Sequence, residues 1–349
     1  MDAMVLFQAA GADALPIVTN AATGQLEHEK FALMVKERCE QTVRDRFNWR
    51  EAYTDVRPLV APRPNEFWRT TVCRVRRTGK NKEEIIVKVK RVSPKSRDPD
   101  AEFNENMFEA HFMERIGRAS HKNIMRLLAV YAYARTREIY MELEDCGAPL
   151  TTRLERHRGR MPIPLAAWYF RQALAALAYV HSRKIIHCDV KGDNLFVRPD
   201  GTLRLGDFGM SQECGVAFGP VPWNPRTINP RGYMPYELLV PGSRVTCAVD
   251  VYALGCVFVC AIAGEPVPFN TVSIEDQLAA IALFSPGAPN ATRPPVGLAL
   301  FNGLDPEPPL ADLLSRMLLW DQSRRIVAAA AHEHEFFYTV PPPDSELFK

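Results

Sequence analysis

IIHCDVKGDNLFVRPDGTLRLGDFG, residues 185–209, is the stretch that decides the fold of this 349-residue chain. Its second part, LFVRPDGTLRLGDF, alternates apolar and polar residues on either side of a Pro-Asp-Gly turn, which is typical of a β-hairpin. One acid, Asp189, lies just before the hairpin, and another, Asp207, lies at its end. The pattern therefore predicts that two neighbouring loops bring these carboxylates together.

The polar residues of this stretch have the chemistry that phosphoryl transfer requires. Asp189 could orient an attacking hydroxyl and accept its proton. Lys191 could neutralise charge on the moving phosphoryl group. Asn194 and Asp207 offer oxygen atoms of the kind that Mg²⁺ prefers. We therefore take Asp189 and Lys191 as candidate catalytic residues, and Asn194 and Asp207 as candidate magnesium ligands.

The order and spacing of these residues resemble the catalytic and magnesium loops of eukaryotic-type protein kinases, in which H-R-D-L-x-x-x-N precedes D-F-G. The resemblance covers roughly residues 64–338. It implies an α+β, bilobal protein kinase-like fold with a small β-rich N-lobe, which carries one key helix, and a larger, mostly helical C-lobe. It also implies ATP and Mg²⁺ as cofactors and proteins as substrates.

Three residues outside the opening stretch extend the resemblance. RGYMPYELL places Glu237 in the position of the acid in the family's A-P-E segment. WDQSRRI, far downstream, offers Arg325 as the buried partner of that acid. Asp250 matches the acid at the head of the central helix, and the resemblance implies that it caps the backbone of the catalytic loop.

Composition and spacing set off the first segments of the chain, and the resemblance implies how the rest divides into lobes. Residues 1–25 are Ala-rich without a sustained period, LEHEKFALMVKERCEQTVRDRFN has helical spacing, and VRPLVAPRP is rich in proline. We expect a flexible arm over 1–25, a helical extension with a Pro-rich linker over 26–63, the N-lobe over 64–145, the C-lobe over 146–338 and a free tail over 339–349.

The N-lobe offers two lysines for the nucleotide. Phe67–Arg76 and Glu84–Arg91 alternate like the strands of a hairpin, and the second strand places Lys88 and Lys90 on one face. The resemblance implies that one of them binds ATP, with the residue two positions earlier against adenine. Because Lys90 would put charged Lys88 there, whereas Lys88 puts Ile86 there, we favour Lys88.

A helix over Phe103–Ile116 is predicted from its apolar spacing. The resemblance implies that its glutamate pairs with the strand lysine, and Glu109 matches better than the alternative, Glu114. REIYMELEDCG resembles the last strand and the hinge, with Met141 as the gatekeeper and 142–144 as the hinge that binds adenine through its backbone. The residues that the resemblance assigns to the nucleotide site are Val72, Ile86, Lys88, Glu109, Met141, Glu142 and Glu144.

Besides Pro235-Tyr236 in place of Ala-Pro before Glu237, the chain departs from the family at two places that bear on function. The window that matches the glycine-rich loop, NEFWRTTV (residues 65–72), contains no glycine, so its backbone cannot approach phosphates as closely. Cys188 stands where most regulated kinases have the arginine that binds an activation-loop phosphate. We therefore expect activity without phosphorylation of that loop, in which Ser211 and Thr227 are the only Ser or Thr residues before Glu237.

Lys191 in DVKGDN resembles the form of the loop found in Ser/Thr-specific kinases. The IIVK and LRLGDFG strings, with the glycine-free window, also resemble kinases of large DNA viruses such as herpesviruses. Two alternative functions stay open at this point. One is a pseudokinase scaffold that binds nucleotide or partner proteins, which the missing glycines favour, and the other is a small-molecule phosphotransferase.

Net charge and cysteine usage indicate which partners and which cellular compartment to expect. The net charge of +2 gives no global field for nucleic acid or an anionic membrane. The eight cysteines include no C-x-x-C pair, which is typical of reduced thiols, and the N-terminus lacks the basic region of a signal peptide. The most apolar run, Val251 to Gly264, is too short to span a bilayer. We expect an intracellular protein, cytoplasmic or nuclear, that binds neither nucleic acid nor membrane.

Overall fold

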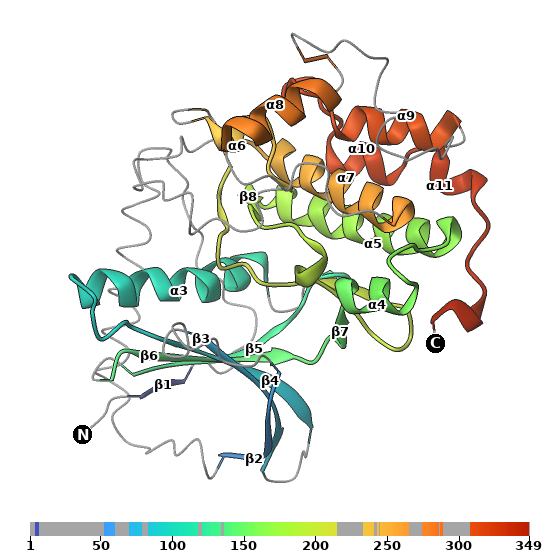
Figure 1. The fold of residues 1–349 in the computed structure, drawn as a ribbon. Coiled ribbons are helices and arrows are strands. Elements are labelled where there is room, and N and C mark those ends of the chain that lie inside the picture. The colour runs from blue at the N-terminus through green and yellow to red at the C-terminus, as the bar shows by residue number, and fades with distance from the viewer. Residues whose placement is uncertain are drawn as a thin grey trace. The chain divides into compact units, whose positions relative to one another are not determined.

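The fold is drawn in Figure 1 from a computed structural model. The structure describes residues 4–6, 52–59, 70–78, 83–117, 121–133, 136–214, 233–240, 243, 245–264, 274–285, 287–288 and 308–348. Contacts divide the chain into two compact units. Unit 1 contains Met1–Ser120 and Met125–Asp145, and unit 2 contains His121–Ile124 and Cys146–Lys349. The chain therefore passes finally into unit 2 after Asp145.

Unit 1 is an antiparallel sheet with one long helix, α3. Its elements are β1 (Met4–Leu6), β2 (Tyr53–Pro58), β3 (Thr70–Arg77), β4 (Glu84–Arg91), α3 (Pro99–Ile116), β5 (Leu127–Tyr133) and β6 (Glu138–Glu144). The six strands lie in the order β1-β5-β6-β4-β3-β2. Each neighbouring pair is antiparallel. The central position of β4 explains why its residues are mostly buried.

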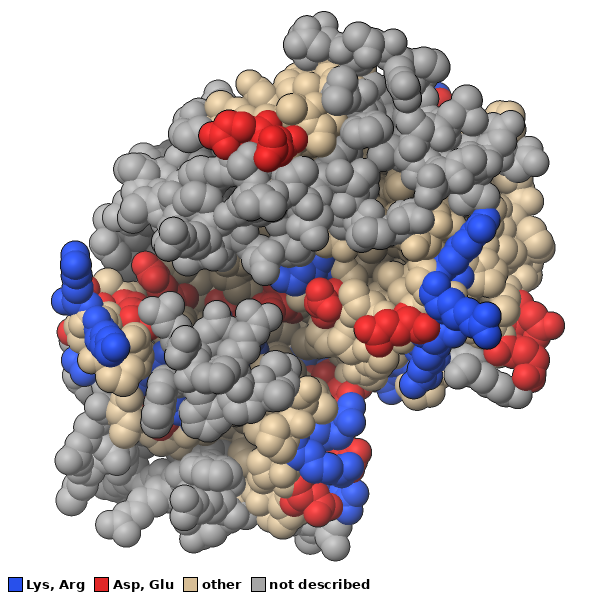
Figure 2. Space-filling model, viewed as in Figure 1, with Lys and Arg blue, Asp and Glu red and all other residues tan. Residues whose placement is uncertain are grey.

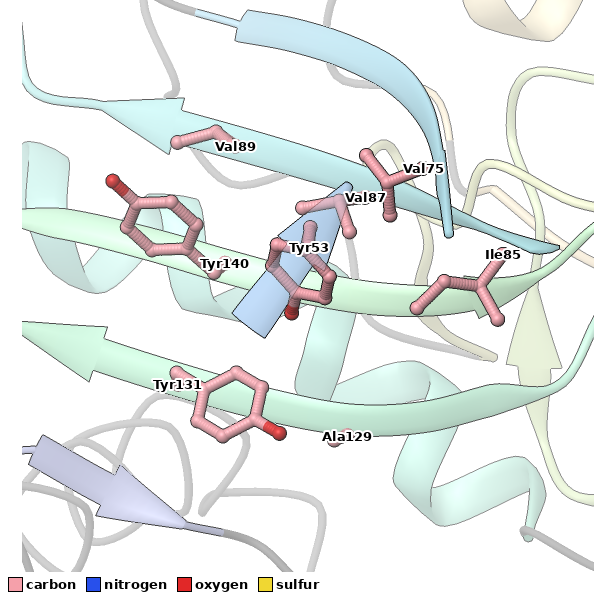
Figure 3. Close-up of a cluster of buried hydrophobic side chains, with 8 residues drawn as sticks. All are labelled: Tyr53, Val75, Ile85, Val87, Val89, Ala129, Tyr131 and Tyr140. Carbon is pink, nitrogen blue, oxygen red and sulfur yellow. The ribbon is translucent and has the colours of Figure 1, made fainter. Parts of the chain in front are cut away.

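Strand β4 divides its side chains between the two faces of the sheet. Ile85, Val87 and Val89 belong to a buried cluster on one face, which Figure 3 shows with three tyrosines from other strands. Because successive side chains of a strand point to opposite faces, Ile86 and Lys88 lie on the other face. This alternation places an apolar core on one side of β4 and the predicted lysine on the other.

Helix α3 packs against β4, β5 and β6. It begins at Pro99, four residues before the predicted start at Phe103. Asp98 caps this end, where its side chain accepts a hydrogen bond of 3.0 Å from the amide of Ala101. Proline is favoured in the first turn because it needs no amide partner there. The first turn therefore follows from its cap rather than from the apolar spacing used to predict the helix.

Two strands lie where the sequence predicted irregular chain. Tyr53–Pro58, assigned to the linker, forms the edge strand β2 and pairs with β3. Its proline is the last residue of an edge strand, where a missing amide costs little. Residues Met4–Leu6, assigned to the flexible arm, pair with β5. The helix predicted from Leu26 to about Asn48 lies outside the described residues.

Unit 2 is mainly helical, which together with unit 1 confirms the α+β class. Its strands and single turns are β7 (Ala148–Pro149), β8 (Ile185–Ile186), η1 (Gly192–Asn194), β9 (Leu195–Val197), β10 (Leu203–Leu205), β11 (Gln212–Glu213) and η3 (Ser345–Phe348). Its helices are α4 (Leu150–Arg156), α5 (Ile163–Ser182), α6 (Tyr236–Leu239), α7 (Ala248–Ala263), α8 (Ile274–Phe284), α9 (Pro308–Met317), α10 (Ala328–His332) and α11 (Phe336–Thr339). The hairpin predicted around Pro-Asp-Gly is confirmed, because β9 and β10 pair antiparallel.

Helices α5 and α7 form the centre of unit 2. The rings of Phe170 and Phe258 stack between them with centroids 4.2 Å apart. Nearly every residue of α7 is buried, and Gly264 ends the helix in the left-handed conformation, with φ of 76°. Among the described residues, every helix is too short or too polar to cross a membrane.

The first residues of the segment predicted as a free tail, 339–349, lie beside helix α5. Val340 and the prolines at 341–343 line a cavity together with Trp168 and Arg171 of α5. Arg171 also donates a hydrogen bond of 3.0 Å to the hydroxyl of Tyr338, which lies in α11 just before this segment. Pro341 and Pro342 are nevertheless exposed, so this part of the segment borders α5 without being buried, and the free tail stays a prediction.

Candidate functional site

The catalytic candidates of unit 2 form one hydrogen-bonded cluster. Lys191 Nζ donates to Asp189 Oδ2 at 2.8 Å. Asn194 Nδ2 donates to the same oxygen at 2.8 Å and to the Asp189 carbonyl at 2.7 Å. The turn η1 reverses the chain between Lys191 and Asn194, so that the Asn194 side chain contacts Asp189, five residues earlier. The sequence predicted all three residues, and the structure brings them together.

The environment of Asp189 suits a proton acceptor. Burial raises the pKa of this carboxyl, while Lys191 and the hydrogen bond from Asn194 oppose the rise. A carboxylate with a raised pKa takes up a proton more readily, and its neighbours still favour the charged form that a base needs.

Asp250, in the first turn of α7, holds the backbone of this loop. Its carboxylate accepts hydrogen bonds of 2.8 Å from the amides of both His187 and Cys188. His181 Nε2 lies 2.9 Å from the same carboxylate. The predicted capping role of Asp250 is therefore confirmed. Cys188 takes a left-handed φ of 64°, which is uncommon for a residue other than glycine, and this capped backbone holds it there.

Gly206 joins the catalytic loop to the Asp-Phe-Gly segment. Its amide donates to the Asn194 carbonyl at 2.9 Å, and its own carbonyl lies 2.9 Å from His187 Nε2. Asp207 follows with a left-handed φ of 58°, and Phe208 is fully buried with its ring 4.8 Å from that of His187. The hydrogen bonds of the Gly206 backbone thus fix the position of the neighbouring residue, Asp207, relative to Asn194.

The oxygen atoms that these two loops offer fit a magnesium ion whose remaining ligands would be phosphate oxygens and water. Within the described ranges, no three His, Cys, Asp or Glu side chains gather closely enough to hold a metal by themselves. Mg²⁺ is usually held by one or two carboxylates together with phosphate oxygens and water. Asp207 and Asn194 offer hard oxygens on loops that share the Gly206 anchor. Their role as ligands stays a prediction.

Two lysines of unit 1 contact one glutamate. Lys88 Nζ donates to Glu109 Oε1 at 2.9 Å, and Lys90 Nζ lies 2.7 Å from Glu109 Oε2 as an ion pair. The side chain of Glu109 is only 1% exposed. Glu109, the favoured candidate over Glu114, therefore contacts both lysines. The second ion pair, with Lys90, was missed at the sequence level, and the choice between the lysines stays open.

The register of β4 and β6 shows which residues share the Lys88 face. Met141 lies directly opposite Lys88 and is fully buried, whereas Leu143 lies opposite Ile86. If Ile86 faces adenine, its cross-strand neighbour is Leu143 rather than the predicted gatekeeper Met141. The sequence analysis placed Leu143 inside the predicted hinge and not on the Ile86 face, although the alternation of IYMELE indicates that face. Val72 on β3 lies opposite Lys88 on its other side.

Glu142 and Glu144 are placed differently from the predicted hinge. Both belong to strand β6, which continues through Glu144. The backbone of Glu142 lies between β4 and β5, where it pairs with Val87 and Ala129. Its backbone is therefore committed to the sheet, so Glu142 is not a hinge residue. Glu144 ends the strand, and its amide donates to the Arg126 carbonyl at 3.0 Å.

The side chain of Glu142 lies on the face opposite Lys88. Its Oε1 accepts a hydrogen bond of 2.5 Å from the Tyr53 hydroxyl, and its Oε2 forms an ion pair with Arg77. Burial is the first cause that raises the pKa of the Tyr53 hydroxyl, and the charge of Glu142 is the second. Glu142 thus joins the edge strand β2 to the sheet instead of facing the predicted nucleotide.

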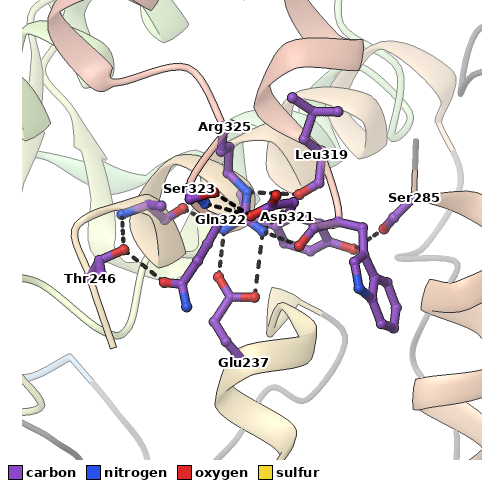
Figure 4. A network of polar contacts seen from close by, with 11 residues as sticks. Glu237, Thr246, Ser285, Leu319, Asp321, Gln322, Ser323 and Arg325 are labelled. Carbon is purple, nitrogen blue, oxygen red and sulfur yellow. Dashed lines mark hydrogen bonds and ion pairs between the residues drawn. The ribbon is translucent and has the colours of Figure 1, made fainter. Parts of the chain in front are cut away.

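The predicted pair of Glu237 and Arg325 is confirmed. Arg325 Nη1 lies 2.6 Å from Glu237 Oε1, and Nη2 lies 3.4 Å from Oε2 (Figure 4). The guanidinium also donates to the carbonyls of Leu319, Trp320 and Ala248. Its side chain is fully buried. This network ties α6 to the start of α7 and to the loop before α10.

The hydroxyls predicted to be dispensable are only partly described. Ser211 is buried, and its Oγ lies 3.4 Å from the carbonyl of His187. Thr227 lies outside the described residues.

On the face that Figure 2 shows, the acidic and basic side chains that are described lie interspersed.

Comparison with known proteins places this site in a family. Residues 70–337 match the family model for the protein kinase domain. The match covers well over half of the chain, so the chain belongs to the protein kinase family. Its fold is the bilobal kinase fold, with unit 1 as the N-lobe and unit 2 as the C-lobe.

The relatives of this chain include plant kinases. The chain is similar to cyclin-dependent kinase C-2 of Oryza sativa subsp. japonica, with 32% identity over 222 residues, which cover 59% of this chain and 42% of the relative. It is also similar to cyclin-dependent kinase C-2 of Arabidopsis thaliana, with 30% identity over 222 residues and the same coverage. The chain thus matches less than half of each relative's length. These comparisons give no support to the resemblance to viral kinases.

Proposed function

We propose that this chain is a serine/threonine protein kinase that transfers the γ-phosphoryl group of ATP to protein hydroxyls. The observation that supports this most is the cluster of Asp189, Lys191 and Asn194, joined through Gly206 to Asp207. A scaffold that only binds has no chemical need for a buried acid with a lysine and an amide on one of its oxygens. The serine/threonine preference rests on Lys191, which resembles that form of the loop.

The residues of unit 2 divide the chemical step between them. The oxygen of the substrate hydroxyl attacks the γ-phosphorus, ADP leaves with the electrons of the broken bond, and the hydroxyl proton passes to Asp189. Lys191 keeps Asp189 charged and oriented through its 2.8 Å contact and offers positive charge to the moving group. Mg²⁺, when held by Asn194 and Asp207, supplies charge neutralisation at the phosphates.

The proposal includes a second element, independence from loop phosphorylation. Cys188 cannot form the bidentate contact that arginine makes with a phosphate. The loop amide of Cys188 is nevertheless held by Asp250, so the loop backbone has a support that does not depend on a phosphate.

The names of the relatives suggest a partner protein, because they are named as cyclin-dependent kinases. We therefore also propose that a cyclin be tested as an activating partner of this chain.

The test is phosphate transfer from labelled ATP with Mg²⁺ to a generic protein substrate. Asp189→Asn keeps the shape of the side chain but removes the base, and we expect the rate to fall about 10²- to 10⁴-fold. Asp193→Asn is the matched control, because Asp193 lies in the same loop with an exposed side chain bound to Thr151. Equal rates for the two variants would refute the role of Asp189.

The same assay separates the two lysines. Lys88→Met and Lys90→Met each remove one of the two cations that contact Glu109, and Lys95→Met removes an exposed lysine from the loop after β4. We expect Lys88→Met to raise the KM for ATP and lower kcat, with a smaller effect of Lys90→Met. The reverse order would assign the nucleotide lysine to Lys90.

One observation favours a second function, a pseudokinase scaffold. The segment that joins β2 to β3, residues 59–69, reads LVAPRPNEFWR and contains no glycine. Glycines let a backbone approach phosphates closely. Under this alternative, nucleotide binding measured by calorimetry persists while wild-type transfer is no faster than that of Asp189→Asn.

A further inference from the structure

Two cysteines of unit 2 lie with their sulfur atoms in contact. Cys214 Sγ and Cys247 Sγ are 3.3 Å apart. Cys214 follows β11 and is exposed, whereas Cys247 precedes α7 and is half-buried. The sulfurs of a disulfide are about 2.0 Å apart, so the two sulfur atoms must approach each other by about 1 Å for the bond to form. Neither cysteine belongs to the cluster of Asp189, Lys191 and Asn194 described above.

The backbone on both sides of this pair is held in place. The amide of Cys214 donates to the Lys184 carbonyl at 2.9 Å, which extends the pairing of β11 with β8. On the other side, Thr246 Oγ1 donates to Gln322 Oε1 at 2.8 Å and accepts from the amide of Ala248. Because these contacts hold both backbones, we expect the sulfurs to close mainly by rotation of the two side chains.

We propose that Cys214 and Cys247 are a site of disulfide formation by a two-electron oxidant such as hydrogen peroxide. In the first step the sulfur of Cys214 attacks one peroxide oxygen, which gives a sulfenic acid and one water. In the second step the sulfur of Cys247 displaces the hydroxyl from Cys214 and forms the S–S bond, and its thiol proton leaves with that hydroxyl as a second water. Two thiols are oxidised and one peroxide is reduced.

The surroundings of the two thiols assign the order of these steps. Burial raises the pKa of the Cys247 thiol, and the hydrogen bond to Cys214 raises it further. The Cys247 thiol is therefore protonated at neutral pH and attacks peroxide slowly, whereas Cys214 is exposed to solvent. Cys214 meets the oxidant first, and Cys247 resolves the product because it is already in contact.

A third cysteine nearby provides the internal control. Cys188 packs beside Cys247 against the cluster of Ile186, Val245 and Val249. Burial raises the pKa of the Cys188 thiol well above its usual value, and the charge of Asp250 adds to this. Cys188 is therefore expected to stay a thiol while the other two react.

The bond would join two parts of the C-lobe that the catalytic loop depends on. Cys214 lies five residues beyond Gly209, and Cys247 lies three residues before Asp250, which caps the loop. The disulfide would hold β11 against β8 in the paired arrangement described above. We therefore expect oxidation to preserve this arrangement and to slow hydrogen exchange at the amides of residues 212–214.

The test treats the whole protein with hydrogen peroxide, blocks the remaining thiols, and maps peptides by mass spectrometry without reduction. We expect a peptide pair linked through Cys214 and Cys247 that dithiothreitol separates. Cys214→Ser and Cys247→Ser should each abolish the link, and Cys188→Ser and Cys73→Ser should leave it. The wild-type linkage stands as a readout even if a variant fails to fold, and it requires no kinase activity.

Two results would overturn the proposal. One is a link from Cys214 or Cys247 to Cys188 in place of the predicted pair. The other is oxidation of Cys214 to a sulfinic acid with Cys247 still a free thiol, because this would show that Cys247 cannot resolve the intermediate.

Discussion

Replacing Arg325 with methionine tests the buried network of Figure 4 most directly. The substitution keeps much of the side-chain volume but removes the guanidinium from Glu237. Loss of one partner of a buried ion pair typically costs about 3–5 kcal/mol, because the other charge is left without compensation. Arg325 also donates to three carbonyls, so the cost should lie at the upper end, near 5 kcal/mol.

A second pair of variants shows whether this reasoning is right. Glu237→Gln keeps an oxygen that can accept from Arg325, so we expect a smaller cost of about 2 kcal/mol. The double variant Arg325→Met/Glu237→Leu removes both charges but leaves the carbonyls of Leu319, Trp320 and Ala248 without this donor. It should stay at least about 2 kcal/mol less stable than wild type, yet more stable than Arg325→Met alone.

The measurement is urea denaturation followed by circular dichroism, which reports mainly on the helices of unit 2. Arg316→Met is the matched control, because Arg316 forms an exposed ion pair with Asp312 whose loss should cost less than about 1 kcal/mol. If Arg325→Met and Arg316→Met unfolded at the same urea concentration, the buried network would not carry the stability assigned to it.

Three further predictions concern the catalytic loop and the activation loop that follows it. Asp250→Asn should speed hydrogen exchange at the two loop amides that Asp250 caps by about tenfold or more, since a charge-assisted bond contributes about 1.5–3 kcal/mol; unchanged exchange would show that other contacts hold the loop. Lys191→Met should move the acidic limb of the kcat/KM profile to higher pH, because Lys191 opposes the rise that burial causes in the pKa of Asp189, and the base must be deprotonated to act. A shift to lower pH would contradict this role. Ser211→Ala/Thr227→Ala should keep at least about half of the wild-type transfer rate, and a collapse of activity in a folded protein would refute independence from loop phosphorylation.

The local features of the site could be predicted from the sequence because they depend on short spacings. The hairpin between Asn194 and Asp207 follows from alternation about one turn, and the contact of Asp189 with Lys191 follows from two positions of separation. The pair of Glu237 and Arg325 lies 88 positions apart, and it was found only through the family resemblance.

Other features depend on tertiary structure and escaped the sequence. The end of β6 is set by its pairing with β4 and β5, so Glu142 was assigned to a hinge that begins later. Strand β2 was missed because proline was taken as a linker signal, although Pro58 only ends an edge strand. Cys214 and Cys247 are 33 positions apart and belong to no motif, so only the fold brings their sulfurs together.

The hydrogen bonds from the loop amides to Asp250 have a consequence for how the sequence of this loop can evolve. Its carboxylate holds main-chain amides, and every residue type except proline supplies one. Residue 188 can therefore be substituted without loss of the hydrogen bond to Asp250, provided that the new residue tolerates the left-handed backbone there. Under the proposal above, a cysteine in place of an arginine removes the contact with a phosphate, while the amide that Asp250 holds and the position of Asp189 stay the same.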